Sequence, residues 1–154
     1  MALHISSLAF KDGENIPHQY TKDGQNKSPA LHWTGTPIKT TSLVLIVHDP
    51  DAHVPGGFTH WIIFNLPAGT KELLEAITWG DHLVNGATQC KNDGGVTGYL
   101  GPAPPPGNPH HYHFKLYAID KILDLTPTAG RTEVLDAIRG HILDEAELTG
   151  LYQR

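Results

Sequence analysis

The chain has 154 residues, of which 39% are hydrophobic and 18% are charged, a composition typical of one globular domain with a sizeable core. Its formal net charge of −5 argues against a nucleic-acid-binding surface and against a broadly basic surface for anionic membranes. The single cysteine, Cys90, excludes an intrachain disulfide and fits a reducing compartment. We recognise no signal peptide and no apolar run long enough to span a bilayer, so we expect one domain over residues 1–154, located in the cytoplasm.

Short strands dominate the expected secondary structure, because glycine and proline are abundant, with 16 and 12 residues. Apolar runs that are continuous or alternate with polar residues predict strands at 3–10, 29–33, 41–47, 61–66, 112–120 and 146–152. The strand at 41–47 contains the continuous apolar run Leu43–Val47, so we expect both of its faces to be covered.

One helix is convincing from its pattern. Thr132–Gly140 carries its apolar residues on one stripe, and Gly130 or Thr132 could cap its first turn. A weaker pattern at 72–76 predicts a second helical turn. Several short strands without alternating helices predict a mainly β fold, an antiparallel β-sandwich with one or two short helices.

The first candidate loop, 48–61, separates two apolar runs and holds two carboxylates and three histidines. Titratable groups at the ends of buried strands are often functional. Asp49 directly follows the buried strand, and we interpret it as a pocket residue. For Asp51 we favour turn chemistry, in which the carboxylate accepts hydrogen bonds from nearby backbone N–H groups. His60 opens the next strand and would be an ordinary core histidine if it stood alone.

A second loop, 98–109, also runs from glycines and prolines into an apolar strand. On the period of two that strands follow, His110 shares a face with Tyr112, and His111 and His113 point the other way. His110, like His60, stands where a candidate loop leads into an apolar strand. We therefore hypothesise that the two loops meet and form one site.

Two imidazoles and one carboxylate support three kinds of site. They can bind a metal, they can perform acid–base catalysis with Asp49 orienting a histidine, or they can bind an anion through imidazole and backbone N–H groups. The metal interpretation lacks the usual local ligand spacing, and the catalytic one lacks a nucleophile motif, since Cys90 lies in a polar segment. The anion interpretation gains from Gly101 and Gly107, whose backbone N–H groups a ligand could approach closely. Pro104 and Pro105 belong to a stiff proline wall that would preorganise the pocket.

These motifs together resemble the phosphatidylethanolamine-binding protein family, in particular its bacterial and archaeal branch of Raf kinase inhibitor-like proteins. The resemblance covers nearly the whole chain through the segments Ile16–Thr21, Asp23–Trp33, His48–Ala52, Thr59–Pro67, Gly98–Ala118 and Gly140–Leu148. It implies a sandwich of antiparallel sheets with a small anion pocket at one end. By the family motif, that pocket is formed by Asp49, His60, His110 and Tyr112.

The sequence departs from the family pattern at three positions. His111 stands where the family usually has arginine, His53 where it usually has proline, and Lys22 where many prokaryotic relatives have cysteine. Animal members carry a C-terminal helix beside the pocket that is not found after Leu148, so we expect a more open pocket here.

We therefore expect a non-enzymatic binding protein for phosphate or phosphorylated head groups, with no cofactor and no metal. The expected ligand-binding residues are Asp49, His60, His110, Tyr112, Gly101, Pro104 and Pro105. If both histidines donate hydrogen bonds as imidazolium, anion binding should weaken as the pH rises through the histidine range. The resemblance also implies a protein kinase or another signalling protein as a partner, and a homodimer. The alternative is a metal-dependent hydrolase that uses the same histidines and aspartate.

Overall fold

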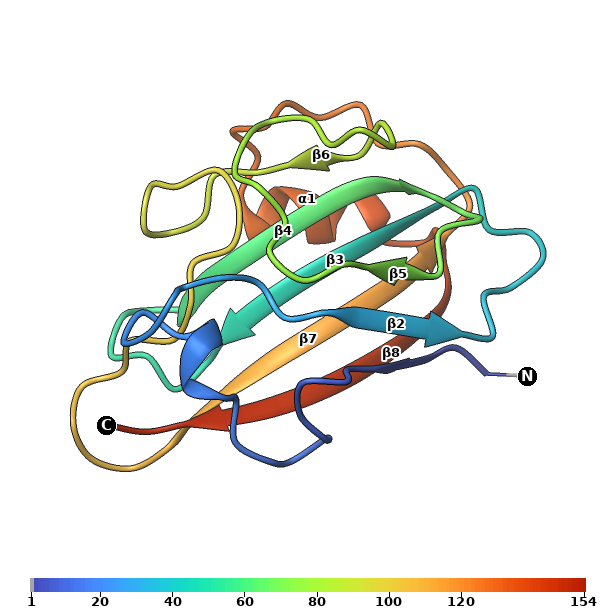
Figure 1. Ribbon diagram of the computed structural model, residues 1–154. Helices are drawn as coiled ribbons and strands as arrows, with labels where there is room; N and C mark the ends of the chain where they lie inside the picture. Colours follow the sequence, from blue (N-terminus) through green and yellow to red (C-terminus); the bar gives the residue numbers. More distant parts are fainter. Residues whose placement is uncertain (1) are drawn as a thin grey trace.

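Two antiparallel sheets and one helix lie in three layers in the computed structural model, which describes residues 2–154 (Figure 1). The large sheet has the strand order β6-β4-β3-β7-β8, and the small sheet has the order β1-β2-β5. The elements are β1 (His4–Ser6), η1 (His18–Tyr20), β2 (Leu31–Thr34), β3 (Ser42–Asp49), β4 (Phe58–Pro67), β5 (Glu72–Leu73), β6 (Thr88–Gln89), β7 (His110–Ile119), α1 (Arg131–Ile138) and β8 (Ile142–Tyr152). The predicted mainly β antiparallel sandwich is confirmed.

Strand β3 is the centre of the molecule, and all eight of its residues are buried. Leu45 and Val47 belong to the apolar cluster between the two sheets. Val44 and Ile46 alternate with them and belong to a second cluster, on the face of the large sheet that α1 covers. The expectation that both faces of this strand are covered is confirmed, and this double burial explains the continuous apolar run in its sequence.

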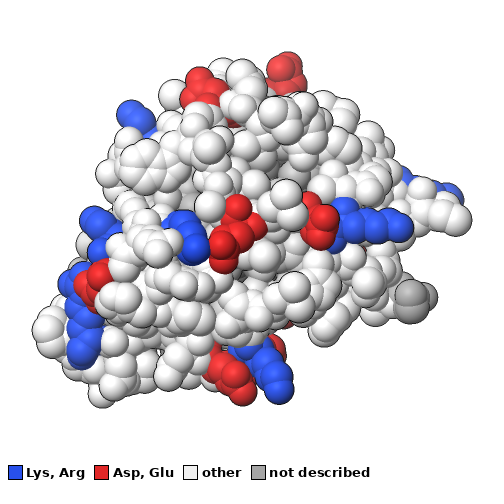
Figure 2. All heavy atoms as spheres, viewed as in Figure 1, with Lys and Arg blue, Asp and Glu red and all other residues white. Residues whose placement is uncertain are grey.

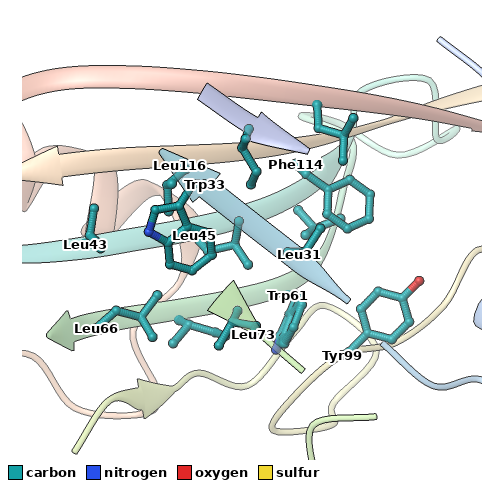
Figure 3. Packing of buried hydrophobic residues seen from close by; sticks show 14 of the residues in the cluster. Leu31, Trp33, Leu43, Leu45, Trp61, Leu66, Leu73, Tyr99, Phe114 and Leu116 are labelled. Carbon is teal, nitrogen blue, oxygen red and sulfur yellow. The ribbon is translucent and has the colours of Figure 1, made fainter. Parts of the chain in front are cut away.

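Large aromatic side chains fill the space between the sheets (Figure 3). The rings of Trp61 and Tyr99 pack edge to face, with 5.4 Å between their centroids, which is a favourable arrangement for their quadrupoles. The indole N–H of Trp61 donates to Oε1 of Gln89 at 2.8 Å, so this buried polar group has a partner. Trp61 adjoins His60 in β4, and the packed ring helps to hold this end of the strand in place.

The predicted helical turn at 72–76 is wrong, because Glu72–Leu73 forms β5. Leu31 and His32 of β2 pair with these two residues, and Leu73 is only 4% exposed in the inter-sheet core. Burial of this leucine against the small sheet outweighs the weak local helical preference. Helix α1 begins one residue earlier and ends two residues earlier than the pattern predicts.

Three strands begin earlier than their apolar patterns indicate. β8 begins at Ile142 instead of 146. β4 begins at Phe58 instead of 61, and β7 begins at His110 instead of 112. His60 and His110 are therefore inside paired strands, where the sheet fixes their backbones.

Acidic and basic side chains are interspersed on the face seen in Figure 2, without a continuous patch of either sign. In the described part of the chain, residues 2–154, no helix has the length and apolar character needed to cross a bilayer.

Candidate functional site

A cavity of about 260 Å³ lies at one end of the large sheet, between the loop that follows β3 and the loop that precedes β7. All seven residues that the sequence predicts for the site line this cavity: Asp49, His60, Gly101, Pro104, Pro105, His110 and Tyr112. The hypothesis that the two loops meet is confirmed.

Antiparallel pairing explains why these residues converge. The last residue of β3, Asp49, pairs with the first residue of β4, Phe58. On the other side of β3, His48 pairs with His113 near the start of β7. The end of one strand and the beginnings of its two neighbours therefore lie at the same end of the sheet (Figure 1).

The Asp49 carboxylate fixes the orientation of His110. Its Oδ2 accepts a hydrogen bond from Nδ1 of His110 at 2.7 Å, and its Oδ1 accepts one from the backbone N–H of Asp51 at 2.8 Å. Both members of the Asp49–His110 pair are buried, with side chains 4% and 7% exposed. Because Nδ1 is committed to the carboxylate, only Nε2 of His110 is free to meet a ligand.

The turn contact predicted for Asp51 is made by Asp49 instead, whose Oδ1 accepts the hydrogen bond from the backbone N–H of Asp51. The Asp51 carboxylate reaches the start of β7. Its Oδ2 accepts hydrogen bonds from the backbone N–H of His111 at 2.8 Å and from Nδ1 of His111 at 2.7 Å. Burial opposes ionisation of Asp51, but the hydrogen bonds from His111 prevail and lower its pKa. His111, at the position where the family usually has arginine, therefore forms a hydrogen-bonded pair with the carboxylate of Asp51.

His60 is held by the backbone of the opposite loop. Its Nδ1 lies 2.6 Å from the carbonyl oxygen of Leu100, and since a carbonyl can only accept, Nδ1 carries the hydrogen. Burial lowers the pKa of His60 to about 4, although the Leu100 carbonyl and the Asp49 charge act in the opposite direction. Near neutral pH, Nε2 of His60 therefore carries a lone pair, and the predicted donor role of His60 would require protonation of this ring.

Nε2 of His60 is open to the cavity. Within residues 2–154, this atom makes no hydrogen bond. The only fully buried side-chain N or O atom in this range that lacks a partner is Oγ1 of Thr40, so Nε2 of His60 is not fully buried. The ring of Tyr112 meets the His60 ring edge on, with 5.2 Å between the centroids. Burial raises the pKa of Tyr112, and the charge of Asp49 raises it further, so its hydroxyl stays neutral and can donate to a ligand.

Gly101 does not act as the expected backbone donor to a ligand. Its N–H donates to Oδ1 of Asn26 at 2.7 Å. A Cβ on Gly101 would lie 2.6 Å from the carbonyl oxygen of Tyr20, so the absence of a side chain allows two segments of the cavity wall to pack closely. Gly107 does not line the cavity, and its N–H lies 3.4 Å from the carbonyl oxygen of Arg154.

Sequence reasoning missed a cation at the site. Lys22 lines the cavity, together with Ala52, His53, Phe58, Leu100 and Ala103. The backbone N–H of Lys22 donates to the carbonyl oxygen of Pro102 at 3.0 Å, which attaches the segment around Lys22 to the proline wall. The only signal for this contact was the position of Lys22 beside the family-like segment that begins at Asp23.

The comparisons with known proteins agree on one family. The model of the family described as phosphatidylethanolamine-binding protein matches residues 6–153. A UPF0098 protein from Methanothermobacter thermautotrophicus is 47% identical over 152 residues, which cover 99% of each chain. The chain therefore belongs to the phosphatidylethanolamine-binding protein family.

Solved structures of two bacterial family members share the fold. A homologue from Chlamydia trachomatis superposes with a TM-score of 0.90 at 36% identity, covering 99% of this chain and 98% of the other. YbcL from Escherichia coli, reported as a new member of the mammalian family, gives a TM-score of 0.92 at 30% identity, covering 100% and 99%.

Gly101→Ala is expected to destabilise the fold by about 1–3 kcal/mol, because the added Cβ would force two backbone segments apart. Urea unfolding measures the change. Gly69→Ala is the matched control, since a Cβ there has nothing within 4 Å, and it should shift stability by less than about 0.5 kcal/mol. Equal effects of the two substitutions would contradict the packing role of Gly101.

The His60 ring is expected to titrate near pH 4 instead of 6.5, which NMR of the ring signals measures. Between these values the unfolded chain binds a proton that the folded protein excludes, so stability is lost as the pH falls. This one group should account for a loss of about 3 kcal/mol. His60→Phe should remove that part of the pH dependence of urea unfolding, and an unchanged dependence would contradict the low pKa.

Proposed function

We propose that this protein is a non-enzymatic binding protein whose cavity holds phosphate or the phosphate of a phosphorylated head group. The observation that carries the proposal is that Lys22, Tyr112 and His110 line one small cavity together. The ammonium and the hydroxyl are donors, and His110 donates as well when its ring is protonated.

The Asp49–His110 pair suits an anion in spite of its carboxylate. A phosphate at Nε2 of His110 would place the ring between two negative groups, and both would favour imidazolium. Binding would then draw a proton onto His110, and the carboxylate would stabilise the donor form. A charge-assisted hydrogen bond of this kind is stronger than a neutral one.

Several features support binding without covalent catalysis. No serine, threonine or cysteine is among the residues that line the cavity. Cys90 belongs instead to the apolar cluster beside α1, where burial raises the pKa of its thiol to about 12. A thiol of that kind is a poor nucleophile at neutral pH. Tyr112 is also protected from ionisation by burial.

The hydrolase alternative has less structural support. Within residues 2–154, no three histidine, cysteine, aspartate or glutamate side chains are grouped closely enough to hold a metal ion. Of the candidate ligands, Asp49 already accepts hydrogen bonds at both of its oxygens. The phosphate-binding proposal needs no change in these contacts.

Lys22→Gln is expected to weaken the binding of phosphoethanolamine about threefold to tenfold. An exposed ammonium a few ångströms from an anion contributes about 1 kcal/mol in water, and a tenfold change corresponds to about 1.4 kcal/mol. Isothermal titration calorimetry at low ionic strength measures the affinity. Lys39→Gln is the matched control, because Lys39 is also exposed but does not line the cavity.

The two variants have the same net charge, so their difference reports only the local effect of Lys22. If Lys22→Gln and Lys39→Gln weaken binding equally, Lys22 acts through the overall electrostatic field of the protein and not from the cavity. If neither phosphate nor phosphoethanolamine binds to the unmodified protein, the proposed function is wrong.

A further inference from the structure

The two histidines in the cavity are held by acceptors of different charge. Nδ1 of His110 donates to the Asp49 carboxylate, and Nδ1 of His60 donates to the neutral carbonyl of Leu100. A carboxylate partner carries a full charge that favours the imidazolium form of a ring, whereas the weaker effect of the Leu100 carbonyl does not overcome the burial that keeps His60 neutral. The same cavity therefore presents one Nε2 that can become a donor and another that is an acceptor.

We infer that Nε2 of His60 accepts a hydrogen bond from the ligand, and that the cavity thereby selects anions that carry their own hydroxyl hydrogen. The preferred class is the monoanion of phosphate or of a phosphate monoester. Tetrahedral anions without a P–OH group, such as sulfate esters, would place an oxygen lone pair against the lone pair of Nε2. This inference rests on the proposed function and specifies the protonation state of the ligand.

The surroundings of His60 keep its ring in this state. The ring is 6% exposed and packs between the rings of Phe58 and Tyr112, whose centroids lie 4.7 and 5.2 Å from its own. A ligand that does not donate to Nε2 would bury this acceptor without a partner, which carries a full desolvation penalty.

The charged and titratable groups around His60 come from several elements. Asp49, His110, Tyr112, His53 and Lys22 line the cavity with it. From outside the cavity, the charge of Asp93 favours protonation of His60, and that of His48 opposes it. Burial outweighs all of these charges, so the ring stays neutral near neutral pH.

The charge of the cavity wall also suits a monoanion. Lys22 and Asp49 carry opposite charges, and His110 adds a positive charge only when it is protonated. These three groups therefore give the wall a net charge between zero and plus one. With His110 protonated, such a wall neutralises one negative charge on a ligand and leaves the second charge of a dianion unmatched.

Methyl phosphate and methyl sulfate form the sharpest pair of probes. At about pH 5, below the second pKa of about 6 of a phosphate monoester, each carries one negative charge and one methyl group. The two anions have nearly the same shape, and they differ in the central atom and in the hydrogen that methyl phosphate carries on one oxygen. Calorimetric titration of both probes into the unmodified protein should show methyl phosphate binding at least about tenfold more tightly, as expected for one hydrogen bond in a buried site.

His60→Phe separates this effect from the weaker basicity of sulfate oxygens. The phenyl ring fills similar space but has no acceptor, so the preference for methyl phosphate should fall severalfold in the variant. An independent readout does not require the variant to fold. In the unmodified protein at neutral pH, the ¹⁵N signals of the His60 ring should show a protonated Nδ1 and an unprotonated Nε2.

The outcomes distinguish the two proposals. Equal affinity for the two probes, or a protonated Nε2 at neutral pH, would overturn the acceptor role of His60 and leave the anion cavity standing. Failure of both probes and of inorganic phosphate to bind would overturn the anion cavity and the acceptor role together.

Discussion

The hydrogen bond between Asp49 and His110 joins the end of β3 to the beginning of β7, and the site depends on it. The two residues are 61 positions apart in the chain, and their side-chain atoms lie 2.7 Å apart. The contact exists only because β3 and β7 pair in one register, in which His48 lies opposite His113. A slip of one residue would turn His110 and Tyr112 to the other face of the sheet.

Burial on both faces of β3 is what fixes that register. Its alternate side chains enter two different cores, one between the sheets and one beside α1. A slip by one residue would exchange the side chains that enter the two cores. Burial also lowers the pKa of His60, whose Nδ1 contacts a backbone carbonyl, while Nδ1 of His110 contacts a carboxylate. The different roles proposed for these two chemically identical side chains depend on this difference.

Much of this arrangement could be predicted from the sequence, because its signals are local. The apolar run 43–47 predicted a doubly covered strand, and period-two alternation correctly placed His110 on one face with Tyr112. The family-like motifs predicted Asp49, His60, His110 and Tyr112, and the glycine and proline loop predicted Gly101, Pro104 and Pro105, all of which line the cavity. By contrast, the small strand β5 was missed, since its two residues are held by pairing with β2 and not by any pattern of their own.

The contacts that decide the chemistry of the site were not predictable in the same way. The hydrogen-bond partner of His60 is the backbone carbonyl of Leu100. Because every residue has a backbone carbonyl, the sequence does not indicate which one a histidine will contact. Gly101 looked like a ligand-binding amide, but its N–H is already bonded to Asn26, which lies 75 positions away. The position of Lys22 at the cavity likewise depends on the path of the η1 segment. Such long-range loop contacts carry no periodic signal, and the acceptor role proposed for His60 depends on one of them.

The most direct test of this account is the affinity of Asp49→Asn for inorganic phosphate near neutral pH, with the fold checked by thermal unfolding. The substitution keeps the shape of the side chain and removes its charge. If the carboxylate orients His110 and favours its donor form, phosphate binding should weaken at least about tenfold. Removal of a negative charge would otherwise strengthen the attraction of an anion, so unchanged or tighter binding would contradict the central role of the Asp49–His110 pair.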